Sequence, residues 1–189
     1  YGRKGYGARI GYGTNENHFD LIYFHAKDDS GSIQLINQTL TLRPQENTVV
    51  GASYRFTFLK KIIWSADIAA SALSQDLAAP KVNKDTLTKT LNRFFYSFIN
   101  FRNSTTTGLA GQTLLTFLLK NFNTTFGYRL VESGFQSLGT PYTLNDVEVY
   151  QWNGGSTLAK GKVNINANIN EQHNDISKQL ESELHTTTG

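Results

Sequence analysis

The stretch KVNINANIN, residues 162–170, alternates between hydrocarbon and amide side chains. Val163, Ile165, Ala167 and Ile169 occupy every second position, and asparagines fill the positions between them. Because successive side chains of a β-strand point to opposite faces, this stretch predicts a strand with one apolar face and one face of amides. A water-exposed face of a soluble sheet would normally hold more lysine and glutamate. We therefore expect this strand to border hydrocarbon on one side and a wet interior on the other.

The same alternation recurs earlier in the chain. In residues 49–58, VVGASYRFTF, the even positions are apolar or aromatic and the odd positions are mainly polar or small. Residues 62–71, IIWSADIAAS, resume the pattern after the short segment LKK. For the two apolar faces to coincide, the hairpin must place Phe56 opposite Trp64 across a loop with an odd number of residues.

Three further hairpins follow from the same pattern. The paired segments are 6–12 with 19–23, 108–119 with 122–130, and 146–157 with 162–170. Their turns are TNEN, the two residues Lys120 and Asn121, and LAKG. The sequence therefore predicts about eight antiparallel strands in one domain spanning residues 1–189.

Short and long connections alternate along the predicted strands. The long connections are residues 27–47, 74–105, 132–145 and the segment after residue 173. Bacterial outer-membrane barrels have this asymmetry, with strands of about ten residues, tight periplasmic turns and long extracellular loops. The predicted fold is all-β: an antiparallel transmembrane β-barrel, visible in part, with residues 74–105 as a long extracellular loop or insertion.

One aromatic segment inside that insertion tests the scheme. Residues 90–102, TLNRFFYSFINFR, are apolar enough for a strand, but a spanning strand here would put the Lys120–Asn121 turn on the wrong side of the membrane. Apolar residues also recur near helical spacing at Leu87, Leu91, Phe94, Phe95 and Phe98. We therefore predict a helix or folded loop, packed on or inside the barrel, with a strand as the alternative.

The composition excludes other classes. No apolar run approaches the roughly 18 residues of a membrane helix. The formal charge of +3 is spread over 18 basic and 15 acidic residues without a basic run, so no nucleic-acid partner is predicted. The chain has neither cysteine nor methionine and does not begin with a leader sequence, which indicates an internal piece of a longer polypeptide.

The cost of burying charge in lipid sets the predicted facing of each strand. An arginine turned to lipid at mid-bilayer costs roughly 2–4 kcal/mol, so arginines inside strands must face the lumen. The predicted lumen-lining residues are Arg9, Arg55, Asp67, Arg129, Asn164, Asn166 and Asn168. The predicted lipid-facing residues are Tyr54, Phe56, Phe58, Trp64, Phe126, Tyr128, Val163, Ile165 and Ile169.

Residues 128–175, YRLVESGFQSLGTPYTLNDVEVYQWNGGSTLAKGKVNINANINEQHND, carry a family resemblance. A strand of the form Y-[KR]-x-[IV], a G-[FY]-x-S-L-G loop, an N-D pair and a K-G-K-[LV]-N-[LI] strand follow one another. This order resembles large outer-membrane β-barrel proteins of the Bacteroidota, and NHFDLIYFHAKDD and ENTVVGASYRFTFLKKIIWSADIAASA look similar to earlier parts of these barrels. The resemblance implies a surface-exposed pore or a subunit of a larger outer-membrane complex for transport, secretion or assembly. It also implies a signal peptide, a periplasmic part and further strands beyond this chain.

No catalytic, metal or cofactor site is predicted, and we expect no enzyme. The glycines of residues 5–13, GYGARIGYG, lack the GxGxxG spacing of a phosphate-binding loop and fit a strand. The histidines are separated, without metal-ligand spacing, and no nucleophile, base and carboxylate can be assembled. A divalent cation at Asp28 and Asp29 is the alternative to a solvated acidic turn.

The expected partners are membrane lipid and other outer-membrane proteins. Long loops and exposed aromatic side chains carry recognition. The partner-contact candidates are Phe94, Phe95, Phe98, Phe135 and Tyr142. The competing class is a secreted soluble β-sandwich that binds glycan or protein, in which the apolar faces would be buried against each other.

Overall fold

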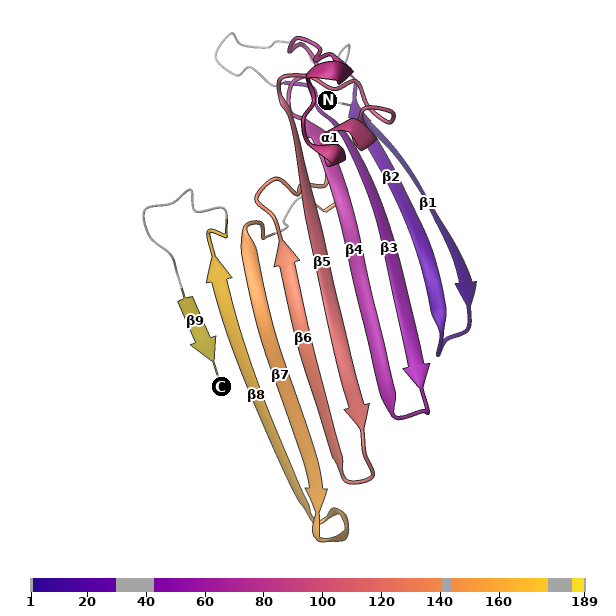
Figure 1. Cartoon of the computed structure of the whole chain (residues 1–189), viewed down its shortest axis with the longest axis vertical. Coiled ribbons are helices and arrows are strands. Elements are labelled where there is room, and N and C mark those ends of the chain that lie inside the picture. Colours follow the sequence, from indigo (N-terminus) through magenta and orange to yellow (C-terminus); the bar gives the residue numbers. More distant parts are fainter. Residues whose placement is uncertain (1, 30–42, 141–143, 177–184, 189) are drawn as a thin grey trace.

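The computed structural model describes residues 2–29, 43–140, 144–176 and 185–188. The strands are β1 (Arg3–Gly13), β2 (His18–Asp28), β3 (Glu46–Phe58), β4 (Ile62–Ser74), β5 (Thr105–Leu118), β6 (Phe122–Val131), β7 (Val147–Leu158), β8 (Val163–Asn174) and β9 (His185–Thr188). They form one antiparallel sheet in the order of the sequence, with β1 and β9 at its two edges (Figure 1). The predicted all-β antiparallel fold is confirmed, and the sheet is open rather than closed into a barrel.

The register of the hairpins follows the alternation in the sequence. Phe56 lies opposite Trp64 across the three-residue loop between β3 and β4, as predicted. Leu118 lies opposite Asn123, and the amide of Leu119 donates to the carbonyl of Phe122, so Lys120 and Asn121 form the predicted two-residue turn. The eight predicted strands are all present, and β9 is an additional one.

The hairpins are staggered in one direction across the sheet. Phe56 to Phe58 of β3 extend beyond the last pair with β2, which joins Arg55 to His18. Thr157 and Leu158 of β7 similarly extend beyond its last pair with β6. Figure 1 shows the result, in which the tight turns descend stepwise from β1–β2 to β7–β8. A consistent stagger of this kind is what a tilted sheet needs in order to close into a barrel.

The long connection between β4 and β5 folds onto one face of the sheet. It contains a short 3₁₀ turn, Lys84–Thr86, and the helix α1, Thr90–Phe95. The prediction of a helix or folded loop is therefore confirmed, and the alternative of a strand is not. Phe95, Ile99 and Phe101 from this insertion are buried against Ala72 of β4. No helix in the described part of the chain is long and apolar enough to cross a membrane.

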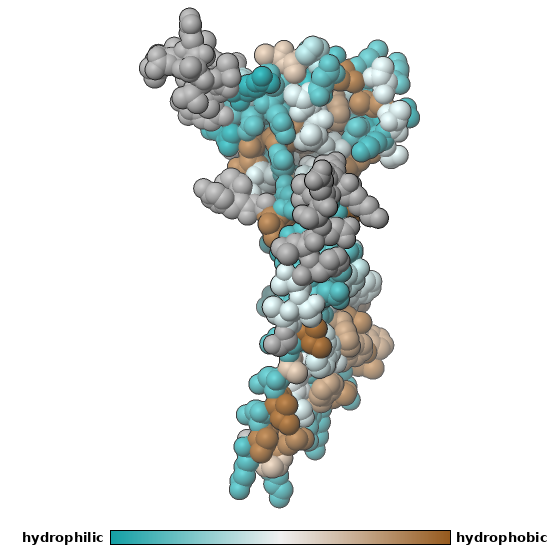
Figure 2. Space-filling model, turned by 90° about the vertical axis from the view of Figure 1, so that its left-hand side faces the viewer, coloured by the Kyte–Doolittle hydropathy of each residue, from teal (hydrophilic) through white to brown (hydrophobic). Residues whose placement is uncertain are grey.

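Figure 2 shows how these parts share the molecule. Its lower part is the thickness of a single sheet, whereas the insertion broadens its upper end. We call the end with the long connections the loop end and the opposite end the turn end.

Candidate functional site: the two faces of the sheet

The register separates the sheet into two chemically different faces. Cross-strand partners share a face, and successive residues of a strand alternate between faces. The polar face contains Arg9, Asp20, Arg55, Asp67, Gln112, Arg129, Asn153, Asn164, Asn166 and Asn168. The apolar face contains Tyr54, Phe56, Phe58, Trp64, Phe126, Tyr128, Val163, Ile165 and Ile169. All residues expected in a lumen thus lie on one face, and all those expected in lipid lie on the other.

Charged groups lie in the middle of the polar face. Arg9 of β1 donates to the carboxylate of Asp20 at 2.7 Å. The amide of Gln112 donates to the carboxylate of Asp67 at 3.0 Å, and Arg129 is the next cross-strand neighbour of Gln112. Within the described residues, Arg129 forms no ion pair, so its guanidinium is available to a solute.

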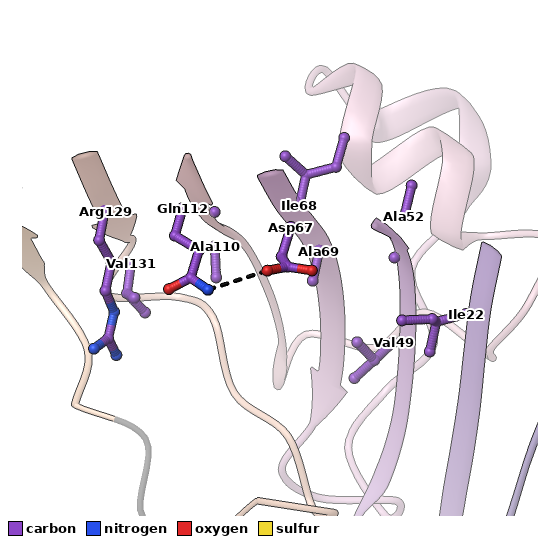
Figure 3. A pocket seen from close by; sticks show the side chains of 12 residues that line it. Ile22, Val49, Ala52, Asp67, Ile68, Ala69, Ala110, Gln112, Arg129 and Val131 are labelled. Carbon is purple, nitrogen blue, oxygen red and sulfur yellow. Dashed lines mark hydrogen bonds between the residues drawn. The ribbon is translucent and has the colours of Figure 1, made fainter. Parts of the chain in front are cut away.

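A hollow of about 470 Å³ lies beside these groups. Asp67, Gln112 and Arg129 line it, together with Ile22 and the small residue Ala69. Figure 3 shows these side chains pointing to one side of the sheet, whereas the neighbouring Ala52 and Ile68 point to the other. The hollow therefore presents a carboxylate, an amide and a guanidinium on one surface.

Toward the turn end of β6, β7 and β8, the polar face carries uncharged amides. Asn153 lies opposite Asn168, and Asn166 lies opposite Gly155. A side chain at Gly155 would collide with the amide oxygens of Asn123 and Asn166, so glycine leaves room for these amides. This part of the face can donate and accept hydrogen bonds without attracting either ion strongly.

Charge is distributed quite differently on the apolar face. Its charged and histidine side chains are confined to the last few residues of each strand at the loop end. These residues are Lys4, His25, Lys27, Glu46, Glu148, Glu171 and His173. From there to the turn end, the described strands place no ionisable group other than tyrosine on this face.

The uncharged part of the apolar face has a defined height, and its two indole N–H groups are hydrogen-bonded within the sheet. From Val50 to Phe58 on β3 the chain rises roughly 26 Å at about 3.3 Å per residue. The indole N–H of Trp64 donates to Thr113 at 2.9 Å, and that of Trp152 donates to Thr124 at 2.8 Å. Indoles on a water-facing surface have no need of such partners, whereas indoles in hydrocarbon do.

The partner-contact candidates separate into buried and exposed residues. Phe94 and Phe98 are 47% and 41% exposed on the insertion. Phe95 is fully buried against β4 and Phe135 is 7% exposed, so both expectations of a contact surface were wrong. Their position in long loops suggested exposure, but both side chains pack on their own sheet. Tyr142 lies outside the described residues.

The acidic turn after β2 has a structural use. The carboxylate of Asp28 pairs with Arg3 at 2.7 Å and accepts from the backbone amide of Gln45 at 2.9 Å. These contacts fix the ends of β1 and β2 and engage the Asp28 carboxylate, which was considered as a cation ligand. Among the described residues, no group of three or more histidine, aspartate or glutamate side chains could hold a metal ion.

Comparison of the chain with protein-family models, with curated proteins and with solved structures finds no match.

Proposed function

We propose that this chain is part of the wall of a bacterial outer-membrane β-barrel, with its apolar face in lipid and its polar face lining a hydrophilic lumen. The observation that carries the proposal is the distribution of charge on the apolar face. A membrane band of about 25 Å must be free of charge, while the borders of the band may carry it. The uncharged part of the apolar face extends over a comparable length, and its charged groups lie at the loop end.

The exposed apolar side chains favour lipid over water. Twelve large apolar side chains on this face are about half exposed or more: Tyr6, Ile10, Tyr12, Phe19, Leu21, Phe56, Phe58, Trp64, Ile68, Phe126, Ile165 and Ile169. Soluble proteins rarely leave a continuous apolar patch of more than a few hundred Å² uncovered. A soluble sandwich, the competing class, would need a second sheet over this whole face. Acyl chains cover it without any further protein.

The edges and the stagger of the sheet favour a larger barrel. Backbone N–H and C=O groups cannot remain unpaired in hydrocarbon, so β1 and the turn-end half of β8 need neighbouring strands. The uniform stagger gives the sheet the tilt that closure requires. Further strands of the same polypeptide would complete the wall, which agrees with the resemblance to large barrels.

Within such a barrel, the polar face supports a passive pore. Arg55, Asp67 and Arg129 lie on this face and could influence which ions pass, without any covalent chemistry. A membrane scaffold within a larger outer-membrane complex is a second candidate. The exposed Phe94 and Phe98 of the insertion favour it, because they lie at the loop end where another surface protein could dock.

Fractionation and gel migration of the full-length protein test the proposal. The protein should appear in the outer-membrane fraction, require detergent for extraction, and migrate faster on gels before boiling than after it. Material that is soluble without detergent would overturn the lipid assignment and favour the sandwich. Conductance in a planar bilayer and co-purification of partners would then separate pore from scaffold.

A further inference from the structure

The connection between β6 and β7 crosses the polar face instead of extending away from the sheet. It leaves β6 at Glu132, whose backbone amide donates to the carbonyl of Leu109 on β5 at 2.9 Å. Gly134 and Phe135 then lie against Gly108 of β5. A Cβ atom added to Gly108 would stand only 2.1 Å from the amide nitrogen of Phe135. The backbone of this connection therefore lies directly on β5.

The connection continues over β4, β3 and β2. The backbone amide of Gln136 donates to the hydroxyl of Ser71 at 3.0 Å. Asn47 donates to the carbonyl of Gln136 at 3.1 Å and accepts from the amide of Leu138 at 3.0 Å. Gly139 reaches the ring of Phe24, the last contact in this series. Residues 132–140 thus cross four neighbouring strands on one face.

The crossing is anchored by side chains that solvent does not reach. Asn47 and Ser71 are both fully buried, and Phe135 packs in a cluster with Val131 and Val147. Buried amides and hydroxyls are costly unless their hydrogen bonds are made, so these anchors need the connection in place. These contacts hold the connection in a single position against the sheet.

We infer that residues 132–140 form a constriction folded into the lumen, which admits small hydrophilic solutes past the hollow at Asp67, Gln112 and Arg129. This inference rests on the proposed function, since it requires the polar face to line a lumen. The apolar anchors of the constriction, Val49 and Ala69 among them, lie at the loop end of the hollow. A solute entering from the loop end therefore passes residues 132–140 before it meets the charged groups.

The charged side chains of the polar face indicate which solutes pass most readily. Arg55 and Arg129 form no ion pair within the described part of the chain, whereas Arg9 is neutralised by Asp20. Asp67 offsets part of this positive charge and is itself hydrogen-bonded to Gln112. Small hydrophilic anions are thus favoured moderately over cations.

The test uses a single introduced cysteine, because this chain has none of its own. Gln112→Cys places a thiol in the hollow, and Ser97→Cys places one on the exposed surface of the insertion. In intact cells, a charged, membrane-impermeant thiol reagent is added from outside and its rate of reaction is measured. With the constriction in place, the thiol at 112 should react at least about tenfold more slowly than that at 97.

Two substitutions release the constriction in different ways, and a third is the matched control. Asn47→Ala removes the hydrogen bonds to Gln136 and Leu138, and Phe135→Ala removes the apolar anchor. Asn92→Ala removes an asparagine on the insertion, whose side-chain oxygen accepts from Thr107 at 2.6 Å, and leaves the crossing intact. The two release variants should accelerate the reaction of the thiol at 112 by about tenfold or more, and the control should not.

Each outcome decides between the alternatives. Equal rates at 112 and 97 in the otherwise unchanged protein, or no acceleration in either release variant, would overturn the constriction. Gel migration that changes on boiling verifies that each variant forms the barrel. If a release variant fails to fold, Ser71→Ala replaces it, because this substitution removes only the hydrogen bond from the amide of Gln136. If the protein proves soluble, the proposed function fails. The docking of residues 132–140 on the sheet can still be measured in that case, by hydrogen exchange of their backbone amides.

Discussion

Arginine placed on neighbouring residues of β8 separates a membrane wall from a soluble sheet. Ala167 lies on the apolar face, midway between Val163 at the turn end and Glu171 at the loop end, and Asn168 follows it on the polar face. Both residues are exposed in the chain as described. Gly154 is the cross-strand neighbour of Ala167, and the ring of Trp152 lies over it. Neither substitution removes a buried contact, so the environment of the new charge dominates the result.

The expected magnitudes differ clearly between the two positions. In a bilayer, an arginine at 167 faces the middle of the hydrocarbon and should lower the free energy of unfolding by roughly 2–4 kcal/mol. An arginine at 168 faces water in the lumen and should change it by less than about 0.5 kcal/mol. On a soluble sheet both positions are ordinary surface sites, and both changes should be equally small.

Denaturant titration of the full-length protein refolded into phospholipid vesicles measures the difference. Tryptophan fluorescence and gel migration before boiling report the folded fraction, and the two variants are compared at equal protein concentration. We expect A167R to be less stable than N168R by about 2 kcal/mol or more. Equal stabilities would refute the assignment of the apolar face to lipid.

Three further substitutions test separate parts of the account. Arg129→Glu should move the reversal potential in a salt gradient toward cation preference, because it reverses a charge that lacks an ion-pair partner in the described residues; an unchanged potential would remove Arg129 from the solute path. Phe95→Ala should destabilise the packing of the insertion by about 3–5 kcal/mol, measured as faster proteolysis within the insertion while the gel migration of the barrel persists. Gly108→Ala should displace residues 132–140, because its Cβ would meet their backbone, whereas Gly111→Ala on the same strand makes only ordinary contacts; equal hydrogen exchange of residues 132–140 in both variants would contradict the crossing.

The sequence was sufficient to predict the sheet because alternation and short turns restrict the register strongly. A slip of one residue between β3 and β4 would move every apolar side chain to the wrong face, so Phe56 could pair with Trp64 but not with its neighbours. Parity of strand direction likewise argued against a spanning strand within the insertion, where α1 is found. The four-residue β9 was missed because so short a segment carries too few alternations to be recognised.

The constriction could not be predicted because its contacts depend on tertiary structure. Phe135 is apolar but isolated in a long connection, so no periodicity indicates what it packs against. Asn47 lies among the ordinary polar residues at a strand end, and its bonds to Gln136 and Leu138 join residues about 90 positions apart. The confinement of charge on the apolar face, by contrast, was readable from the sequence once the strands were assigned. The positions of the arginines alone, which predict the facing of the strands, do not reveal this confinement.

A scan of β8 by lipid-phase quenching would show directly whether the apolar face lies in lipid. Single cysteines at each position from 163 to 169, labelled with a small fluorophore, would be placed in vesicles that contain brominated acyl chains. We expect strong quenching at 163, 165, 167 and 169, which lie on the apolar face, and weak quenching at 164, 166 and 168, which lie on the polar face. Quenching that is weak throughout, or that does not alternate between successive residues, would contradict a lipid-facing wall.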